Sequence, residues 1–331
     1  MKEKEAKYYK VVNGKTHCQL CPHFCKIQDA IAGLCRTRTN KGGTLILTNY
    51  GEITSIAVDP IEKKPLYHFY PGTDILSIGG KGCNLNCIFC QNWHISHGDA
   101  ATRYLSPEQL SEEAAHTEGN IGVAFTYNEP LIWFEYILDC APLLRSRGLK
   151  MVLVTNGYIN PEPLKEILPF IDAMNIDLKG YDETFYSKYC GGKLEPVKHT
   201  VKTAADAGTH IEVTLLIIPT INDDEKKITE MTQWLASVDD TIPFHISRYF
   251  PSYKLDLPPT PIDTLRNAYD IASKKLKYVY LGNQPEFIYS HTYCPSCHKV
   301  VIERHGYSVR ISGILNGNCA HCGGKIDMVG L

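Results

Sequence analysis

The sequence lacks a strong excess of charge of either sign, and it lacks a long hydrophobic run. Its 331 residues carry a formal net charge of −2, so neither nucleic acid nor an anionic membrane is expected as the main partner. The strongest apolar run, VTLLII at residues 213–218, is only long enough for a strand and is followed by Pro219. The first ten residues, MKEKEAKYYK, are charged and contain no apolar signal-peptide core. These absences predict a cytoplasmic protein that does not enter a membrane.

The sequence also lacks an internal repeat and a low-complexity segment. With 44% hydrophobic and 21% charged residues, it has the composition of a globular protein with a sizeable core. Cysteine, by contrast, is abundant, and eleven of the 13 cysteines fall into three compact groups. Because the chain is large and shows no secretion signal, these groups indicate bound metals in a reducing compartment rather than a disulfide framework.

Short β-branched apolar runs recur from about residue 74, with helical patterns between them. Seven runs are expected to be strands: DILSIGG (74–80), GNIGVAFTY (119–127), KMVLVTN (150–156), AMNIDL (173–178), HIEVTLLII (210–218), PFHISRYF (243–250) and LKYVYLG (276–282). Capping side chains before prolines, at Ser106, Asn160 and Thr260, predict three of the helix starts. This alternation predicts an α/β fold, a partial (β/α)6-type TIM barrel whose functional site lies at the C-terminal ends of the strands.

We expect three units along the chain. Residues 1–73 would form a cysteine-rich N-terminal lobe, residues 74–290 the barrel, and residues 291–331 a small tail with its own cysteines. Within the first unit, residues 44–60 alternate in the manner of a small strand pair.

The run GCNLNCIFCQNW holds Cys83, Cys87 and Cys90 at a CxxxCxxC spacing, directly after the first predicted barrel strand. A [4Fe-4S] cluster normally takes four cysteine ligands, so three on one tight loop imply either a distant fourth ligand or an iron left open for another molecule. A zinc knuckle or buried free thiols are the structural alternatives, but zinc sites favour paired CxxC or Cys/His hooks. We therefore expect these three cysteines to hold an iron–sulfur cluster.

This run resembles the cluster-binding motif of the radical S-adenosylmethionine (SAM) enzymes. The resemblance implies that SAM binds the open iron through its amino and carboxylate groups, and that one electron from the reduced cluster releases a 5′-deoxyadenosyl radical. The expected activity is oxygen-sensitive abstraction of hydrogen from a substrate that the sequence does not identify. A low-potential reductant, ferredoxin or flavodoxin, is implied as a partner.

Other strand ends resemble the SAM site of the pyruvate formate-lyase activating enzymes. The resemblance implies that six residues after the second, third and fourth strands help to bind SAM: Tyr127, Asn128, Glu129, Asn156, Asp177 and Lys179. It also implies that His245, on the sixth strand, contacts the adenosine; a structural histidine is the alternative. The match is incomplete, because Tyr127 and Asn128 replace two glycines of that family. Val154 likewise replaces an aspartate, and Thr214 an arginine.

Nearly the full length of the chain is similar to the radical SAM protein of the AmmeMemoRadiSam system. The resemblance rests on CQLCPHFC with Cys35, on VDPIEKKPLYHFYPG (58–72), on GCNLNCIFCQNW, on AFTYNEPLIWFEY, on HISRYFPSY and on the C-terminal cysteine pairs. It implies association with Memo-type and AMME-type proteins and does not identify a native substrate.

Two CxxC hooks flank a hairpin-like stretch near the C-terminus, and they contain Cys294, Cys297, Cys319 and Cys322. This pattern is typical of a zinc ribbon or rubredoxin-like site. Four thiolates predict a closed structural Zn²⁺ site, with mononuclear iron as the alternative.

The remaining group near the N-terminus comprises Cys18, Cys21, Cys25 and Cys35. Thiolates suit both one Zn²⁺ ion and a second [4Fe-4S] cluster, and we expect a closed structural site, zinc in the first instance. Cys140 and Cys190 have no partner in the sequence, so each is expected to be a small buried side chain. A mechanistic thiol is the alternative for Cys190.

Two other functions fit part of the pattern. An activase that makes a glycyl radical on a partner protein would need a mouth wide enough to admit a peptide loop. A metal-sensing or interaction protein with purely structural clusters would bind SAM weakly and tolerate the loss of one cluster cysteine.

Overall fold

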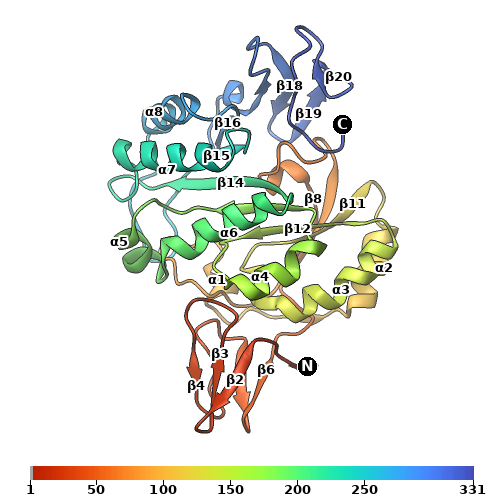
Figure 1. The fold of residues 1–331 in the computed structure, drawn as a ribbon, viewed down its shortest axis with the longest axis vertical. Coiled ribbons are helices and arrows are strands. Elements are labelled where there is room, and N and C mark those ends of the chain that lie inside the picture. Colours follow the sequence, from red (N-terminus) through yellow and green to blue (C-terminus); the bar gives the residue numbers. More distant parts are fainter. Residues whose placement is uncertain (1–2) are drawn as a thin grey trace.

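The computed structural model describes residues 3–331 and is built around one eight-stranded sheet (Figure 1). Seven strands, β9 and β11 to β16, run parallel and are neighbours in chain order, and β8 is added antiparallel to β9 at one edge. The strands are β8 (Ser55–Pro60), β9 (Asp74–Gly79), β11 (Asn120–Phe125), β12 (Lys150–Thr155), β13 (Ala173–Asp177), β14 (His210–Ile217), β15 (Phe244–Arg248) and β16 (Val279–Gly282). All seven predicted strands are present. Because β8 and β16 occupy opposite edges of the sheet, the predicted partial barrel is confirmed.

Helices connect the parallel strands and cover the outer face of the sheet (Figure 1). The α-helices are α1 (Trp93–Ser96), α2 (Pro107–His116), α3 (Phe134–Ser146), α4 (Pro161–Ile167), α5 (Glu183–Phe185), α6 (Leu194–Asp206), α7 (Glu225–Val238) and α8 (Ile262–Ser273). Shorter helical turns are η1 (Ile61–Lys63), η2 (Pro130–Trp133), η3 (Leu168–Phe170), the π-helix η4 (Tyr186–Cys190) and η5 (Phe287–Ser290). Among residues 3–331, no helix has both the length and the apolar character needed to cross a membrane.

The three predicted helix starts differ in their caps. Ser106 forms a capping box with Gln109, as predicted. Asn160 does precede α4, but its side chain donates to the Gln19 carbonyl at 2.7 Å and so joins the barrel to the N-terminal lobe. Thr260 is not a cap, because its hydroxyl donates to the Ile217 carbonyl at 2.6 Å.

The N-terminal lobe consists of two small antiparallel sheets below the barrel (Figure 1). Their strands are β1 (Lys4–Glu5), β2 (Tyr9–Val12), β3 (Lys15–Cys18), β4 (Lys26–Ile27), β5 (Arg38–Lys41) and β6 (Thr44–Leu47). The strand pair predicted within residues 44–60 does not form. Strand β6 pairs with β5, β7 (Glu52–Ile53) pairs with β10 (Arg103–Tyr104), and β8 completes the edge of the barrel sheet.

The C-terminal tail contains β17 (Thr292–Tyr293), β18 (Val300–His305), β19 (Ser308–Ile311), β20 (Ile314–Leu315) and β21 (Asn318–Cys319). Strands β18 and β19 form the predicted hairpin. The tail is joined to the barrel by a parallel bridge between Phe69 and Val329. Arg304 of β18 is fully buried, where it donates to the Tyr67 carbonyl and the Thr292 hydroxyl, both at 2.7 Å.

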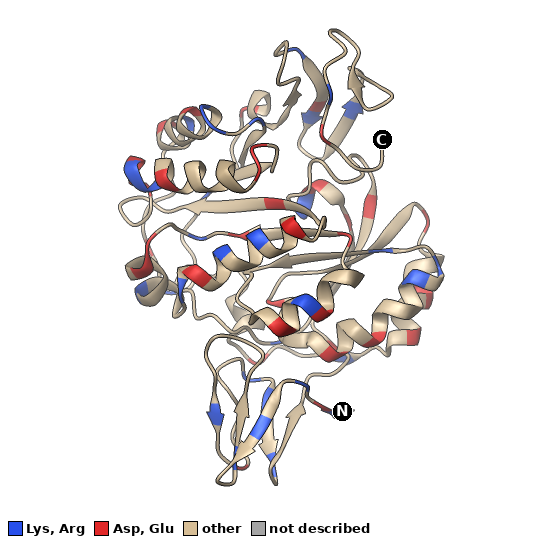
Figure 2. Ribbon diagram, in the orientation of Figure 1, with Lys and Arg blue, Asp and Glu red and all other residues tan. Residues whose placement is uncertain are grey.

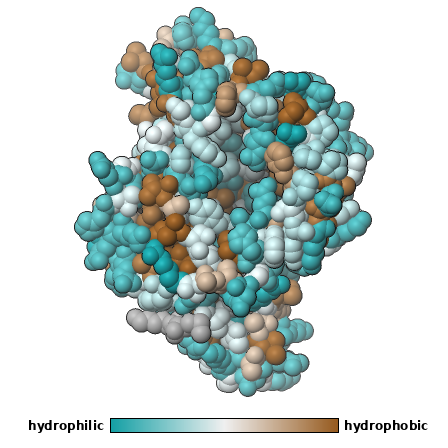
Figure 3. All heavy atoms as spheres, turned by 180° about the vertical axis from the view of Figure 1, so that it is seen from behind, coloured by the Kyte–Doolittle hydropathy of each residue, from teal (hydrophilic) through white to brown (hydrophobic). Residues whose placement is uncertain are grey.

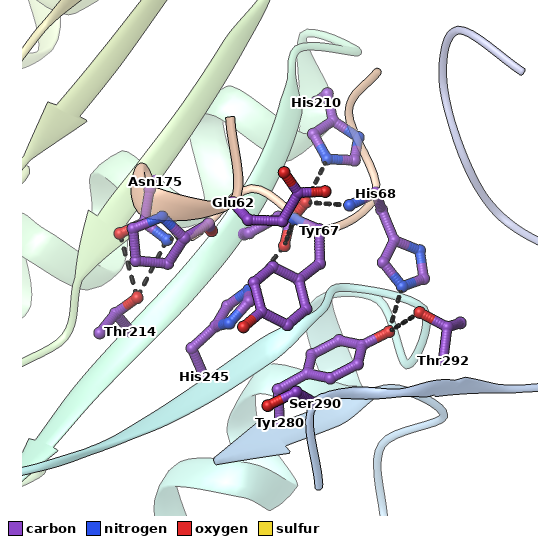
Figure 4. A network of polar contacts seen from close by, with 12 residues as sticks. Glu62, Tyr67, His68, Asn175, His210, Thr214, His245, Tyr280, Ser290 and Thr292 are labelled. Atoms are coloured by element: carbon purple, nitrogen blue, oxygen red, sulfur yellow. Dashed lines mark hydrogen bonds and ion pairs between the residues drawn. The ribbon is translucent and has the colours of Figure 1, made fainter. Parts of the chain in front are cut away.

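A polar network fills the barrel interior beneath the tail (Figure 4). The fully buried Glu212 carboxylate accepts from the backbone amides of Tyr67 and His68 at 2.9 and 2.7 Å, and from the imidazoles of His210 and His245 at 3.0 and 2.6 Å. These donors hold the pKa of Glu212 well below its usual range although burial opposes this. Segment 61–73 thereby closes the N-terminal end of the barrel.

Protonation of His68 at low pH is expected to lower the free energy of unfolding. Its Nδ1 donates to the Asp327 carbonyl and its Nε2 lies 2.6 Å from the Tyr280 hydroxyl, so neither partner of the buried ring carries a negative charge that would stabilise imidazolium. Burial lowers the pKa of His68 from 6.5 to about 4. Between these values the unfolded chain binds more protons than the folded protein, so the free energy of unfolding falls as the pH falls.

We expect the free energy of unfolding to fall by about 2 kcal/mol more in the wild type than in His68→Gln between pH 7 and pH 5. Denaturant titrations of both proteins at the two pH values measure this difference. Equal losses in the two proteins would show that His68 is not the responsible group.

Candidate functional site

A cavity of about 470 Å³ opens at the C-terminal ends of the barrel strands. The loop after β9, residues 80–92, is here called the cluster loop, and it contributes Cys83, Cys87 and Cys90 to the cavity wall. Residues that follow β11, β12 and β13 contribute Tyr127, Asn128, Glu129, Asn156, Asp177 and Lys179. The structure thus brings the three predicted cluster ligands and six of the seven predicted SAM-binding residues to one cavity.

The shape of the cluster loop is set by side chains from the neighbouring strand ends. Asn128 donates to the Gly82 carbonyl at 2.8 Å and accepts from the Gly80 amide at 3.1 Å. Asn92, at the end of the loop, donates back to the Tyr127 carbonyl at 2.7 Å. The residues that replace the family's glycines therefore hold the loop in place.

The three cysteines of the cluster loop fit a cluster better than a single ion. In the described part of the chain, the one group of three or more metal-ligating atoms lying within 4.8 Å of one another is at the C-terminus, so at least one pair of these three Sγ atoms is more than 4.8 Å apart. A cubane carries its thiolates on separate irons and needs such wider spacing. Cys87 is buried, while Cys83 and Cys90 are partly exposed to the cavity.

Glu129 links the ends of β11 and β12 beside this loop. Its carboxylate is 1% exposed and accepts from the Leu131 amide at 2.9 Å, the Thr155 hydroxyl at 2.6 Å and the Asn156 amide at 2.8 Å. Burial raises the pKa of Glu129 to about 7, although these donors oppose the rise. The Asn156 amide group in turn contacts Cys83 Sγ at 3.7 Å and donates to Asn84 Oδ1 at 2.9 Å. Glu129 therefore positions Asn156 against the cluster loop.

Lys179 brings a positive charge to the same cavity. Its ammonium group donates to Asp177 at 2.9 Å and is nearly buried. Burial disfavours the charged form, but the Asp177 carboxylate and the Cys87 sulfur raise the pKa of Lys179 well above its usual range. Lys179 is thus a fixed cation facing the cluster loop.

Cys190 ends the π-helix η4 and lies against Cys87. Its carbonyl accepts from the Asn86 amide at 2.8 Å, and its thiol is in hydrogen-bonding range of Cys87, whose pKa it raises. A π-helical turn commonly marks a functional position. Once Cys87 binds iron as a thiolate, the neighbouring Cys190 thiol would be a hydrogen-bond donor to its sulfur, which is a positioning role for the expected cluster.

Replacement of Cys190 by alanine removes this donor, and the reduction potential of the cluster is expected to become more negative. A hydrogen bond of about 1 kcal/mol corresponds to a shift of about 40 mV for one electron. Redox titration followed by EPR spectroscopy measures the shift. Cys190→Ser keeps a donor and should stay near the wild-type potential; an equal shift in both variants would contradict this role.

His245 does not reach the cavity, so its predicted contact with adenosine is not supported by its position. It pairs in register with Thr214, which lines the cavity, but its imidazole is 5% exposed and bonded to Glu212 at 2.6 Å (Figure 4). The carboxylate on the neighbouring strand holds the ring in the layer below. The structural role is the better interpretation of this histidine.

Sequence reasoning gave no role to Asp59, Lys63 and Lys64, yet both lysines line the cavity. The buried Asp59 carboxylate accepts from both ammonium groups at 2.7 Å and from the Tyr127 hydroxyl at 2.5 Å. Tyr127 adopts a left-handed backbone conformation with φ of 70°, which turns its ring toward this group. No periodic pattern in the sequence indicated this contact, because Asp59 and Tyr127 are 68 residues apart.

The other cysteines lie outside the cavity. At the C-terminus, the Sγ atoms of Cys294, Cys297, Cys319 and Cys322 lie within 4.8 Å of one another, as a four-thiolate metal site requires. Cys18, Cys21, Cys25 and Cys35, here called the N-terminal cysteine set, line a separate small cavity. Cys140 is buried inside α3.

Residues 77–232 match the model of the radical SAM superfamily. The chain is 42% identical to an uncharacterized protein of Methanocaldococcus jannaschii, with 98% of this chain and 99% of the relative covered. It is 24% identical to the pyruvate formate-lyase-activating enzyme of Clostridium pasteurianum over 50% of this chain and 73% of that enzyme.

Two solved structures share the fold. A radical SAM methyltransferase from Sphaerobacter thermophilus aligns with a TM-score of 0.51 at 14% identity, covering 64% of this chain and 67% of the methyltransferase. SuiB from Streptococcus suis aligns with a TM-score of 0.50 at 15% identity and covers 65% of this chain, which spans about half (48%) of SuiB.

Proposed function

Because this chain belongs to the radical SAM superfamily, we propose that it reductively cleaves SAM and uses the resulting 5′-deoxyadenosyl radical to abstract hydrogen from a substrate. The observation that carries the proposal is the convergence of the three-cysteine cluster loop with Glu129, Asn156 and Lys179 on one cavity. When bound, the reduced [4Fe-4S] cluster supplies the electron that cleaves SAM. An external low-potential carrier, ferredoxin or flavodoxin, must deliver that electron.

The residues around the cluster loop are proposed to have different roles in SAM binding. Lys179 offers a cation to a carboxylate, and its pairing with Asp177 fixes the direction of the ammonium group. Glu129 holds the backbone of Asn156 and the start of η2, so the polar edge of the cavity keeps its shape. Lys63, Lys64 and Tyr127, all bonded to Asp59, also line the cavity and are proposed to contact a substrate.

The test is formation of 5′-deoxyadenosine from SAM by anaerobically reconstituted, reduced protein. The expected result is formation that depends on the reductant and on a full complement of iron at the cluster loop. Absence of product from protein with that iron would remove the proposed reaction and favour a metal-sensing or interaction protein instead.

Similarity to pyruvate formate-lyase-activating enzymes supports a second candidate, an activase that makes a glycyl radical on a partner protein. In such an enzyme the 5′-deoxyadenosyl radical takes a hydrogen atom from a glycine, which leaves a glycyl radical and forms 5′-deoxyadenosine. Partner protein with deuterated glycine would place deuterium in that product, whereas a small-molecule substrate would leave it unlabelled. Memo-type and AMME-type proteins are proposed as associated partners on the basis of the sequence resemblance.

We further propose that the C-terminal site holds one structural Zn²⁺. The Sγ separations of 3.6 Å for Cys294 and Cys322 and 3.7 Å for Cys297 and Cys319 support a tetrahedral single-ion site. Cys297→Ser is expected to lower the zinc content by about one ion per chain and to loosen the tail. Zinc analysis and proteolysis of the tail test this; unchanged zinc would contradict it.

A further inference from the structure

We propose that Cys18, Cys21, Cys25 and Cys35, the N-terminal cysteine set, bind a second [4Fe-4S] cluster that passes electrons to the cluster loop. The identity of this second centre stands independently of the radical reaction. Its role in electron transfer rests on the proposed function.

The spacing of the sulfur atoms distinguishes the N-terminal cysteine set from the C-terminal site. At the C-terminal site the paired Sγ atoms are 3.6 and 3.7 Å apart, near the separation of about 3.8 Å that Zn–S bonds of about 2.3 Å impose on a tetrahedron. Within the described residues of the N-terminal cysteine set, no three Sγ atoms lie within 4.8 Å of one another. The four side chains instead surround a small cavity. In this respect they resemble the cluster loop and suit a cubane, whose four thiolates bind separate irons.

The surroundings of this small cavity favour a buried anionic centre. Leu20, Ile27 and Ile132 line it and are each at most 3% exposed. Arg38 also lines it, is fully buried, and is held by Glu135 at 2.6 Å. The Arg38 Nε has no hydrogen-bond partner within residues 3–331. A fixed guanidinium beside thiolates stabilises the negative charge that a reduced cluster gains.

The N-terminal cysteine set lies directly beside the cluster loop. A Cβ on Gly82, which has φ of 93°, would come within 2.5 Å of the Cys35 carbonyl oxygen, so only glycine permits this contact. On the other side of Cys83, the Asn84 carbonyl accepts from His23 at 2.6 Å. Both chain neighbours of a cluster ligand therefore touch residues of the N-terminal cysteine set or its connecting loop. Two centres held by these segments would be neighbours in the fold.

The outer face of the same lobe is suited to an electron carrier. Cys25 is the one partly exposed member of the set, and the adjacent Phe24 is 55% exposed. Residues 3–50 contain eight Lys and Arg against three Asp and Glu, although the whole chain has a net charge of −2 (Figure 2). Lys10 and Lys26 flank His17 in a row across β2, β3 and β4. A hydrophobic patch also marks this lobe at the bottom of Figure 3. These features fit an acidic one-electron carrier protein.

The transfer balances with one electron and no movement of atoms. The reduced carrier is oxidised by one electron while the N-terminal cluster goes from the 2+ to the 1+ state. That cluster then returns to 2+ as the cluster of the cluster loop is reduced to 1+. The second centre has four protein ligands, so it offers no open iron and does not bind SAM.

The metal content of the full-length chain distinguishes a [4Fe-4S] cluster from a zinc ion at the N-terminal cysteine set. A Cys83→Ala/Cys87→Ala/Cys90→Ala variant, reconstituted anaerobically, is expected to retain about four irons and about one zinc per chain. Its reduced EPR signal should not change when SAM is added. Loss of all iron with about two zinc ions per chain would overturn the proposal in favour of zinc. The wild type gives the same test without a substitution. A second cluster predicts about eight irons and about one zinc per chain, whereas zinc at the N-terminal cysteine set predicts about four irons and about two zinc ions.

The electron route is tested with Cys25→Ser/Cys35→Ser. This variant should keep the EPR response of the cluster loop to SAM and should keep dithionite-driven 5′-deoxyadenosine formation, because a small reductant reaches that cluster directly. Formation driven by reduced flavodoxin should fall at least about tenfold. Lys10→Glu/Lys26→Glu should slow only the flavodoxin-driven reaction. Equal rates with flavodoxin in wild type and both variants would overturn the route. If the EPR signal of the cluster loop in the wild type does not change when SAM is added, the proposed function is refuted. The iron count then decides whether the second cluster exists.

Discussion

Cys90→Ala is expected to lower the rate of 5′-deoxyadenosine formation by at least about 1000-fold, equivalent to about 4 kcal/mol in the activation free energy. Cys90 is one of three sulfurs on the cluster loop, and Cys190 is not among the residues that line the cavity. With two protein ligands the cluster cannot be held with one iron reserved for SAM.

The matched control for this variant is Cys140→Ala. Cys140 is fully buried in α3, away from the lining of the cavity. Its loss should cost about 1 kcal/mol of stability and leave the rate within about twofold of wild type. Anaerobic assays with iron quantification compare the two. Comparable activity in Cys90→Ala and wild type would mean that the cluster loop does not hold the catalytic cluster.

Glu129→Ala is expected to lower the free energy of unfolding by about 3 kcal/mol and to weaken SAM binding at least about tenfold. The carboxylate accepts three hydrogen bonds, from Leu131, Thr155 and Asn156, and its removal leaves these buried donors without a partner. Asn156 would then lose its position against Cys83, which explains the coupled loss of SAM affinity. Denaturant unfolding and equilibrium binding of SAM measure the two effects.

Two further variants separate structure from charge at this position. Glu129→Gln keeps the shape and part of the hydrogen bonding and should lie between alanine and wild type. Glu112→Gln, on the exposed face of α2, should change either quantity by less than about 0.5 kcal/mol. A Glu129→Ala protein with wild-type SAM affinity would show that the link between β11 and β12 does not shape the SAM site.

The parts of the fold that sequence predicted are those determined by local patterns. Each barrel strand is an apolar β-branched run bounded by turn residues, and all seven were found at the expected places. The C-terminal metal group was equally local, because its four sulfurs come from two short hooks, and the fold brings them together. The capping box of Ser106 is another local feature, and it formed as predicted.

The features that sequence missed depend on contacts between distant residues. His245 bonds Glu212 and does not line the cavity, because the register of β14 and β15 and a carboxylate 33 residues away determine its direction. Asp59 reaches Tyr127 only because β8 adds to the edge of the barrel sheet. The contact of Cys190 with Cys87 likewise depends on the π-helical turn after β13. Neither periodicity nor residue spacing encodes such pairings.

The sequence favours zinc at the N-terminal cysteine set, and that expectation stays a prediction. Thiolates at this spacing in the sequence suit one ion or a cluster, and only the separation of the folded Sγ atoms distinguishes them. That spacing is the basis for our proposals of a cluster at that set and a single zinc ion at the C-terminus. We thus propose different metals for two four-cysteine groups whose ligands are chemically alike.

The measurement that tests the central claim most directly is the EPR spectrum of the reduced, reconstituted protein with and without SAM, recorded on a Cys25→Ser/Cys35→Ser variant so that only the cluster loop contributes. A reduced cluster signal whose shape changes on addition of SAM is the predicted result, because SAM would bind the open iron. An intact reduced cluster with an unchanged spectrum at saturating SAM would contradict the account of this chain as a radical SAM enzyme.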